Sequence, residues 1–278
     1  MKFGAVAPKD AIGATAVHTI RRGTLVLKKG TLVGAVEAAA LDAAGIAEIV
    51  VARLEPGDVS EDVAAAEIAT AIAGESVHVD RAFTGRANLF ARSAGILVVD
   101  RDPIDQLNRV DEAITVATLS AYKPVVAGEM IATVKIIPFA VAAAARDAAL
   151  AAAKRPVVRV APYRVRKVGI VSTVLPGLSA KVIDKTLKIT AERLAPAGAA
   201  IVAERRVPHE PQALARALED VLRQGAEMVI VFGASAIADR RDVIPAALEA
   251  IGGRIEHFGM PVDPGNLLLI GNAAGHPV

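Results

Sequence analysis

Two carboxylates and a hydroxyl follow a run of small residues near the C-terminal end of this chain. Gly233, Ala234 and Ser235 come directly after an apolar stretch, and Asp239 and Asp242 follow closely. Small side chains let a ligand approach the backbone, and N–H groups at a helix N-terminus attract an anion such as phosphate. Because two bare carboxylates would repel phosphate, the spacing predicts a bridging magnesium ion at Asp239 and Asp242.

Each of these acids also has a simpler interpretation. Asp239 and Asp242 can be acids of a first helical turn that only balance the helix dipole. Asp184, on a preceding predicted helix, can be a solvated residue paired with Lys181 or Lys188. Spacing alone leaves both alternatives open.

The elements expected around these residues alternate between strand and helix from residue 167 onward. The predicted strands are 167–172, 199–207, 228–232, 254–258 and 267–270, and the predicted helices are 179–195, 211–224 and 241–251. Such alternation predicts a three-layer α/β/α domain with a mostly parallel sheet. Ligands of these sheets bind beyond the carboxyl ends of the strands, which indicates the turns after Ser172 and Phe232.

The turn after Ser172 carries hydroxyls and a glycine rather than acids. We expect Ser172, Thr173, Gly177 and Ser179 to contribute to the same ligand site, and Ser179 to cap the following helix.

The preceding part of the chain, residues 1–160, is expected to be a mixed α+β domain, with the second domain spanning 161–278. Helices are predicted at 36–44 and 62–73, and residues 104–118 have the spacing of one helical face. Strands are predicted at 48–54, 95–101 and 130–137. Prolines and arginines within 154–166 interrupt the periodic pattern and predict the hinge.

Composition narrows the function further. The 278 residues have a net charge of only +2 and 3% aromatic residues, which disfavours nucleic acid as a partner. Cysteine is absent, so disulfides and thiolate metal sites are excluded. The chain shows neither a signal peptide nor a long charge-free apolar segment, so we expect a cytoplasmic protein without a membrane partner. The apolar first domain suits a homo-oligomer.

Three blocks of the second domain resemble a known family. They are FGASAIADRRDVIP at 232–245, Asp184-Lys185-Thr186, and PVDPG at 261–265. They are similar to the signatures of the molybdopterin-binding domain shared by molybdopterin molybdotransferases and adenylyltransferases. The segments 18–30, 84–90 and 110–141 resemble bacterial molybdopterin-binding proteins that are often followed by a nucleotidyltransferase-like domain.

This resemblance implies molybdopterin, free or nucleotide-activated, as the ligand, and a role in molybdenum cofactor biosynthesis. It adds Pro264 and Gly265 to the binding residues and gives Asp184, Asp239 and Asp242 a catalytic role in a molybdotransferase- or nucleotidyltransferase-like reaction. Two alternatives stay open: a non-catalytic module that delivers the cofactor to a partner transferase or molybdoenzyme, and a nucleotide pyrophosphatase of the competence-damage type.

The chain also departs from the family pattern. Phe232 replaces the first of two paired glycines, the turn at 172–179 lacks the family's acid, and Thr186 replaces an asparagine. Relatives continue beyond the position of Val278, so we expect the domain to be shortened at its C-terminus. The missing acid favours binding over catalysis.

Overall fold

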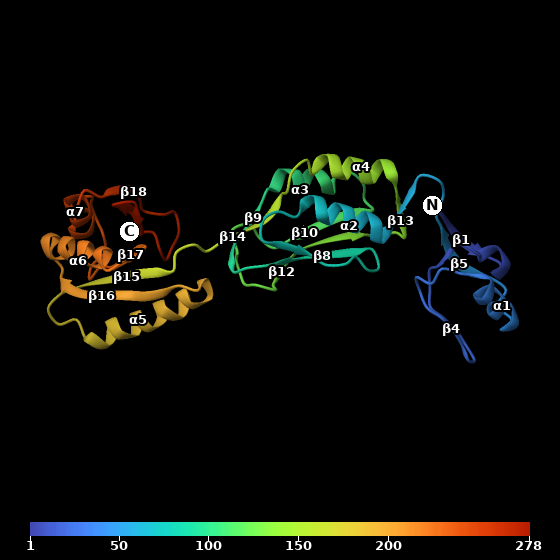
Figure 1. Ribbon diagram of the computed structural model, residues 1–278, viewed down its shortest axis with the longest axis horizontal. Helices are drawn as coiled ribbons and strands as arrows, with labels where there is room; N and C mark the ends of the chain where they lie inside the picture. Colours follow the sequence, from blue (N-terminus) through green and yellow to red (C-terminus); the bar gives the residue numbers. More distant parts are fainter. The chain divides into compact units, whose positions relative to one another are not determined.

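The computed structural model describes residues 1–278 and divides into two compact units, Met1–Pro162 and Tyr163–Val278. Each unit is described by itself, and Figure 1 gives the order of their elements. No helix in either unit combines the length and the apolar character needed to span a membrane.

The first unit contains two hydrophobic cores, of which the first is small and lies at the N-terminus. Its elements are β1 (Lys2–Val6), η1 (Pro8–Ala11), β2 (Thr15–Ala16), β3 (Ile20–Arg22), β4 (Leu25–Leu27), α1 (Ala35–Ala43) and β5 (Ile49–Arg53). The antiparallel sheet has the order β1-β5-β2, and β3 and β4 form a separate hairpin. Leu41 of α1 packs with Ile49 and Val51 of β5.

The second core of this unit is larger and lies among antiparallel strands and three helices. Its elements are β6 (Asp58–Ser60), α2 (Glu61–Ile72), β7 (Val77–Val79), β8 (Arg86–Ala91), β9 (Gly95–Val99), α3 (Arg101–Asn108), β10 (Ile114–Thr118), β11 (Pro124–Val125), β12 (Met130–Ile136), β13 (Ala140–Ala142), α4 (Ala143–Ala152) and β14 (Val158–Pro162). The sheets run β10-β12-β8-β7, β11-β9-β14 and β13-β6. A mixed α+β architecture is therefore observed.

The single helical face predicted over residues 104–118 is wrong beyond Asn108. Helix α3 ends there, and Ile114–Thr118 forms β10, which pairs with β12 in antiparallel register. The sequence ITVAT is rich in β-branched residues, and its buried Ile114 and Val116 alternate with more exposed neighbours. This two-residue alternation and the pairing with β12 outweigh the weaker helical spacing.

The second unit contains the predicted α/β fold. Its elements are β15 (Lys167–Val174), α5 (Ala180–Leu194), η2 (Ala195–Ala197), β16 (Ala200–Pro208), α6 (Pro211–Arg223), β17 (Met228–Phe232), α7 (Val243–Ala250), β18 (Arg254–Phe258), β19 (Leu269–Ala273) and β20 (His276–Pro277). Strands β16, β15 and β17 form a parallel sheet in that order. Helix α5 covers one face, and α6 and α7 lie on the other (Figure 1), which confirms the predicted fold class. The last three strands form a separate antiparallel sheet, β18-β19-β20.

The central strand β15 is buried on both faces over six consecutive residues, from Val168 to Thr173. An unbroken run of buried residues is typical of a strand covered by helices on both sides. At Gly169, a Cβ atom would lie only 3.0 Å from the Cβ of Val221 on α6 and 3.1 Å from that of Ala226. The missing side chain therefore lets α6 pack directly against the sheet, with Leu214 and Leu218 fully buried.

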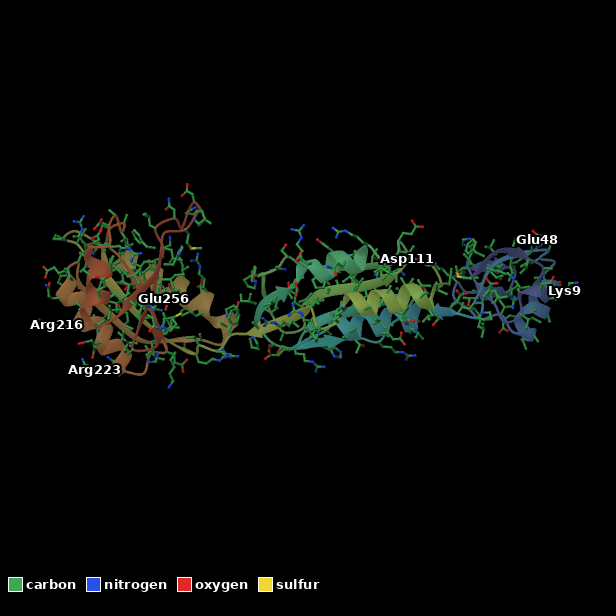
Figure 2. All side chains as sticks on the ribbon, turned by 90° about the horizontal axis from the view of Figure 1, so that it is seen from above. Lys9, Glu48, Asp111, Arg216, Arg223 and Glu256 are labelled. Carbon is green, nitrogen blue, oxygen red and sulfur yellow. The ribbon has the colours of Figure 1, made fainter.

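Truncation of Leu218 to alanine should destabilise the second unit by about 2–5 kcal/mol, because a fully buried leucine leaves a cavity. Hydrogen exchange of the β15 amides, measured by mass spectrometry with first-unit peptides as an internal reference, would report the loss. Arg216→Ala on the exposed face of the same helix (Figure 2) is the matched control, with an expected change of about 0.5 kcal/mol or less. Unchanged protection of β15 in the leucine variant would contradict the packing of α6 on this sheet.

Candidate functional site

The carboxyl ends of the three parallel strands bring separate loops to one edge of the second unit. These are residues 175–179 after β15, the residues at 209–210 after β16, and residues 233–242 after β17. Two of the three loops contain predicted site residues. The sheet direction thus gathers groups that lie more than 50 residues apart in the sequence.

Thr173, at the end of β15, is only 1% exposed and links two of these loops. Its Oγ1 accepts a hydrogen bond from the backbone N–H of Ala234 at 2.8 Å. At Gly233, a Cβ atom would lie 2.8 Å from Cδ1 of Ile244 and 2.9 Å from the carbonyl oxygen of Ser235. Glycine is needed there because the loop passes close to the start of α7.

His209, in the loop after β16, connects the end of β15 to the loop after β17, and the sequence interpretation missed it. Its backbone N–H donates to the carbonyl of Val174 at 3.0 Å. Its Nδ1 lies 2.9 Å from Thr173 Oγ1, and its Nε2 lies 2.9 Å from Ser235 Oγ. Spacing between histidines could not reveal this residue, but its place just after the second parallel strand was an available signal.

A cavity of about 490 Å³ lies beside β17, and its lining includes Gly233, Ser235, Leu267 and Leu268. A second cavity of about 230 Å³ lies between α5 and the strand ends. Its lining is Ser172, Thr173, Leu178, Val182, Ile183, Thr186, Phe232, Gly233 and Ala234. Five predicted binding residues (Ser172, Thr173, Gly233, Ala234 and Ser235) therefore line these two neighbouring cavities.

None of the four remaining predicted binding residues lines either of these two cavities. Gly177 has a φ of +91°, a conformation that favours glycine. Ser179 occupies the N-cap position of α5, but its hydroxyl makes no capping hydrogen bond. Pro264 and Gly265 lie in the exposed loop between β18 and β19 and line neither cavity.

Asp242 is the N-cap residue of α7, one position before the first helical turn in which its simpler interpretation placed it. One oxygen accepts the N–H of Val243 at 2.7 Å, and the other accepts the N–H of Ala238 at 3.1 Å. These two hydrogen bonds hold the pKa of the Asp242 carboxyl below its usual value, and the bond from Ala238 has the larger effect. Its charge therefore stabilises the turn and the helix start.

Asp239 and Asp184 are both paired with arginines. Asp239 accepts a hydrogen bond from Arg241 Nε at 2.6 Å, and this contact lowers the pKa of the Asp239 carboxyl. Asp184, exposed on α5, accepts a hydrogen bond from Arg206 Nη2 at 2.7 Å, so its partner is not Lys181 or Lys188. The chain contains no cluster of three or more histidine, aspartate or glutamate side chains arranged for a metal ion. The magnesium site stays a prediction.

The geometry defines an α/β domain in which small residues, hydroxyls and a histidine gather at the carboxyl ends of the parallel strands. Residues 168–272 match a family model described as a probable molybdopterin binding domain. The match over this stretch confirms the resemblance found in the sequence.

Comparisons with whole proteins add little to this assignment. No curated protein matches the chain. Among solved structures, the chain is similar to a molybdenum cofactor biosynthesis protein from Pyrococcus furiosus, with 13% sequence identity and a TM-score of 0.26. The similarity covers 100% of this chain and 56% of that one, so this chain spans little more than half of its length.

Replacing Asp242 by alanine should cost about 1 kcal/mol of local stability at neutral pH, because α7 loses its N-cap. Since the folded pKa of Asp242 is lowered, this stabilisation is present above the unfolded value of 3.8 and is lost as the pH falls through the folded pKa. The difference between wild type and Asp242→Ala should therefore shrink in acid, while Asp242→Asn retains a cap at all pH values.

Amide exchange of α7, followed from neutral to acidic pH, measures these differences. Glu249→Ala, an exposed substitution near the end of the same helix, is the control. A pH-independent difference between Asp242→Ala and wild type would contradict a charged cap.

Proposed function

We propose that the second unit binds molybdopterin, or its nucleotide-activated form, at the carboxyl ends of β15 and β17, in molybdenum cofactor biosynthesis. The family match over residues 168–272 carries this proposal, because it includes every loop of the candidate site. The gathering of hydroxyls and a glycine loop around two adjoining cavities supports it.

In this proposal the loop after β17 binds the phosphate of the ligand. The backbone N–H groups of Ser235 and Ala236 donate to no acceptor within the chain, whereas that of Ala234 is used by Thr173. Free amides beside an exposed hydroxyl provide several donors for one anionic group. In this proposal Ser235 and these amides bind the phosphate.

In this proposal the pterin ring binds in the cavity between α5 and the strand ends. Its walls are mainly aliphatic, and Ser172, Thr173 and Thr186 provide hydroxyls among them. Apolar walls with a few placed polar groups are typical of small-molecule sites. Phe232 lines the same cavity and can pack against the ring, although the family pattern has glycine at this position.

A second candidate is a non-catalytic binding and delivery module, and one observation favours it over a transferase. The three acids of the second unit that the sequence offers for chemistry are engaged: Asp242 by two backbone N–H groups, Asp239 by Arg241 and Asp184 by Arg206. In this variant a nucleotidyltransferase domain or a molybdoenzyme does the chemistry on the bound cofactor.

Titration of the purified chain with molybdopterin should show saturable binding, with Ser235→Ala weakening it about 10- to 100-fold through the loss of one hydrogen bond to a charged group. Fluorescence of the pterin provides the signal, and Lys188→Ala on the exposed face of α5 is the control. Adding magnesium tests the predicted metal: tighter binding that Asp239→Asn abolishes would support a bridging ion.

No binding by the folded chain, with or without magnesium, would contradict the proposed ligand. Turnover of the bound cofactor that Asp242→Asn abolishes would contradict the passive module and favour a transferase. Hydrolysis of ADP-ribose would instead assign the pyrophosphatase activity.

A further inference from the structure

Residues Thr173, His209 and Ser235 form a continuous hydrogen-bonded chain that links the ends of all three parallel strands. The distances are 2.9 Å from Thr173 Oγ1 to His209 Nδ1 and 2.9 Å from His209 Nε2 to Ser235 Oγ. We propose that His209 is a positioning residue that holds the Ser235 hydroxyl as a hydrogen-bond donor to the anionic group of the ligand. This inference rests on the proposed function.

The direction of the chain follows from the single proton of the Thr173 hydroxyl. Its oxygen already accepts the N–H of Ala234 at 2.8 Å. Two acceptors compete for its proton: His209 Nδ1 at 2.9 Å and the carbonyl oxygen of Phe232 at 3.4 Å. We assign this proton to the nearer acceptor, Nδ1, because the contact with the Phe232 carbonyl is longer than the about 3.0 Å of a normal O–H hydrogen bond.

The state of the imidazole follows from this contact. If Nδ1 accepts, the neutral ring carries its proton on Nε2. The Nε2–H group then donates to Ser235 Oγ at 2.9 Å. The proton of Ser235 itself is not taken by the ring and is free to point to a ligand.

This arrangement is the reverse of an activated serine nucleophile. In that case the imidazole accepts the serine proton through Nε2, and a carboxylate holds the proton on Nδ1. Here the group facing Nδ1 is the buried hydroxyl of Thr173, which is only 1% exposed. The chain therefore makes Ser235 a donor for binding rather than an attacking group.

The arrangement also explains why the glycine loop is held in one place. Thr173 contacts both the ring of His209 and the amide of Ala234, while the ring contacts Ser235 one residue further on. Two consecutive residues of the loop are thus attached to the rigid ends of β15 and β16. Fixing donors before the ligand arrives reduces the entropy lost on binding.

The tautomer can be tested without any ligand. In the intact protein with ¹⁵N-labelled histidine, nitrogen shifts distinguish a protonated ring nitrogen from an unprotonated one, and comparison with His209→Gln assigns the signals of His209. We expect the proton on Nε2 of the neutral ring. A proton on Nδ1 would overturn the inference.

Two amide substitutions separate the contacts of the ring. An asparagine amide lies close to the position of Nδ1, so His209→Asn should retain the contact with Thr173 and lose the contact with Ser235. A glutamine amide reaches the position of Nε2, so His209→Gln should restore a donor to Ser235. We expect molybdopterin affinity within about threefold of wild type for His209→Gln and about tenfold weaker for His209→Asn.

A double-mutant cycle shows whether His209 acts through the serine. The double variant His209→Asn/Ser235→Ala should bind no more weakly than Ser235→Ala alone, since the hydroxyl that His209 positions is already absent. Protection of the β15 amides serves as the control for folding.

Additive losses in the cycle, or wild-type affinity in His209→Asn, would overturn the inference. Failure of the wild-type chain to bind molybdopterin would contradict the proposed function, while the tautomer measurement would still decide the direction of the chain.

Discussion

The site depends on one buried hydroxyl, that of Thr173 at the carboxyl end of the central strand. Because Thr173 is only 1% exposed, its hydroxyl cannot bond to bulk water and must find its hydrogen-bond partners within the protein. Its partners, the N–H of Ala234 and the ring of His209, belong to loops that follow two other strands. The hydrogen bonds of this one hydroxyl therefore fix the loops after β16 and β17 relative to the end of β15.

The sheet determines where these contacts form, because both faces of the central strand are covered and its polar groups can reach the loops only at its end. Val168, Ile170 and Val171 of β15 are fully buried, and α6 reaches the strand closely because Gly169 has no side chain. Because the three strands are parallel, the loops that follow them lie at the same edge of the sheet. The absence of a side chain at Gly233 has a similar effect, because it lets the loop after β17 pack closely against Ile244 at the start of α7.

The sequence predicted the second unit well because its signals are local and repeated. β17 and β18 were predicted with their observed bounds, and the helices agree to within two residues at each end. The error at 104–118 arose where apolar residues fit both a helical and a strand period, and only pairing with β12 decides between them.

His209 was missed for a different reason: its neighbours Thr173 and Ser235 lie 36 and 26 positions away, and no local spacing reveals them. Asp239 and Asp242 were identified as chemical groups, but their hydrogen-bond partners are a property of the folded turn.

The electrostatics of the edge favour binding over proton transfer. Hydrogen bonds lower the pKa values of Asp239 and Asp242, so both carboxylates are ionised at neutral pH and cannot act there as proton donors. Asp239 is paired with Arg241, and Asp242 accepts hydrogen bonds at the start of α7. Both contacts reduce the repulsion between these carboxylates and a phosphate. The amides of Ser235 and Ala236 are among the loop groups that have no hydrogen-bond partner in the chain. Within the proposed function, acids engaged inside the chain and free backbone donors therefore favour a binding module over a transferase.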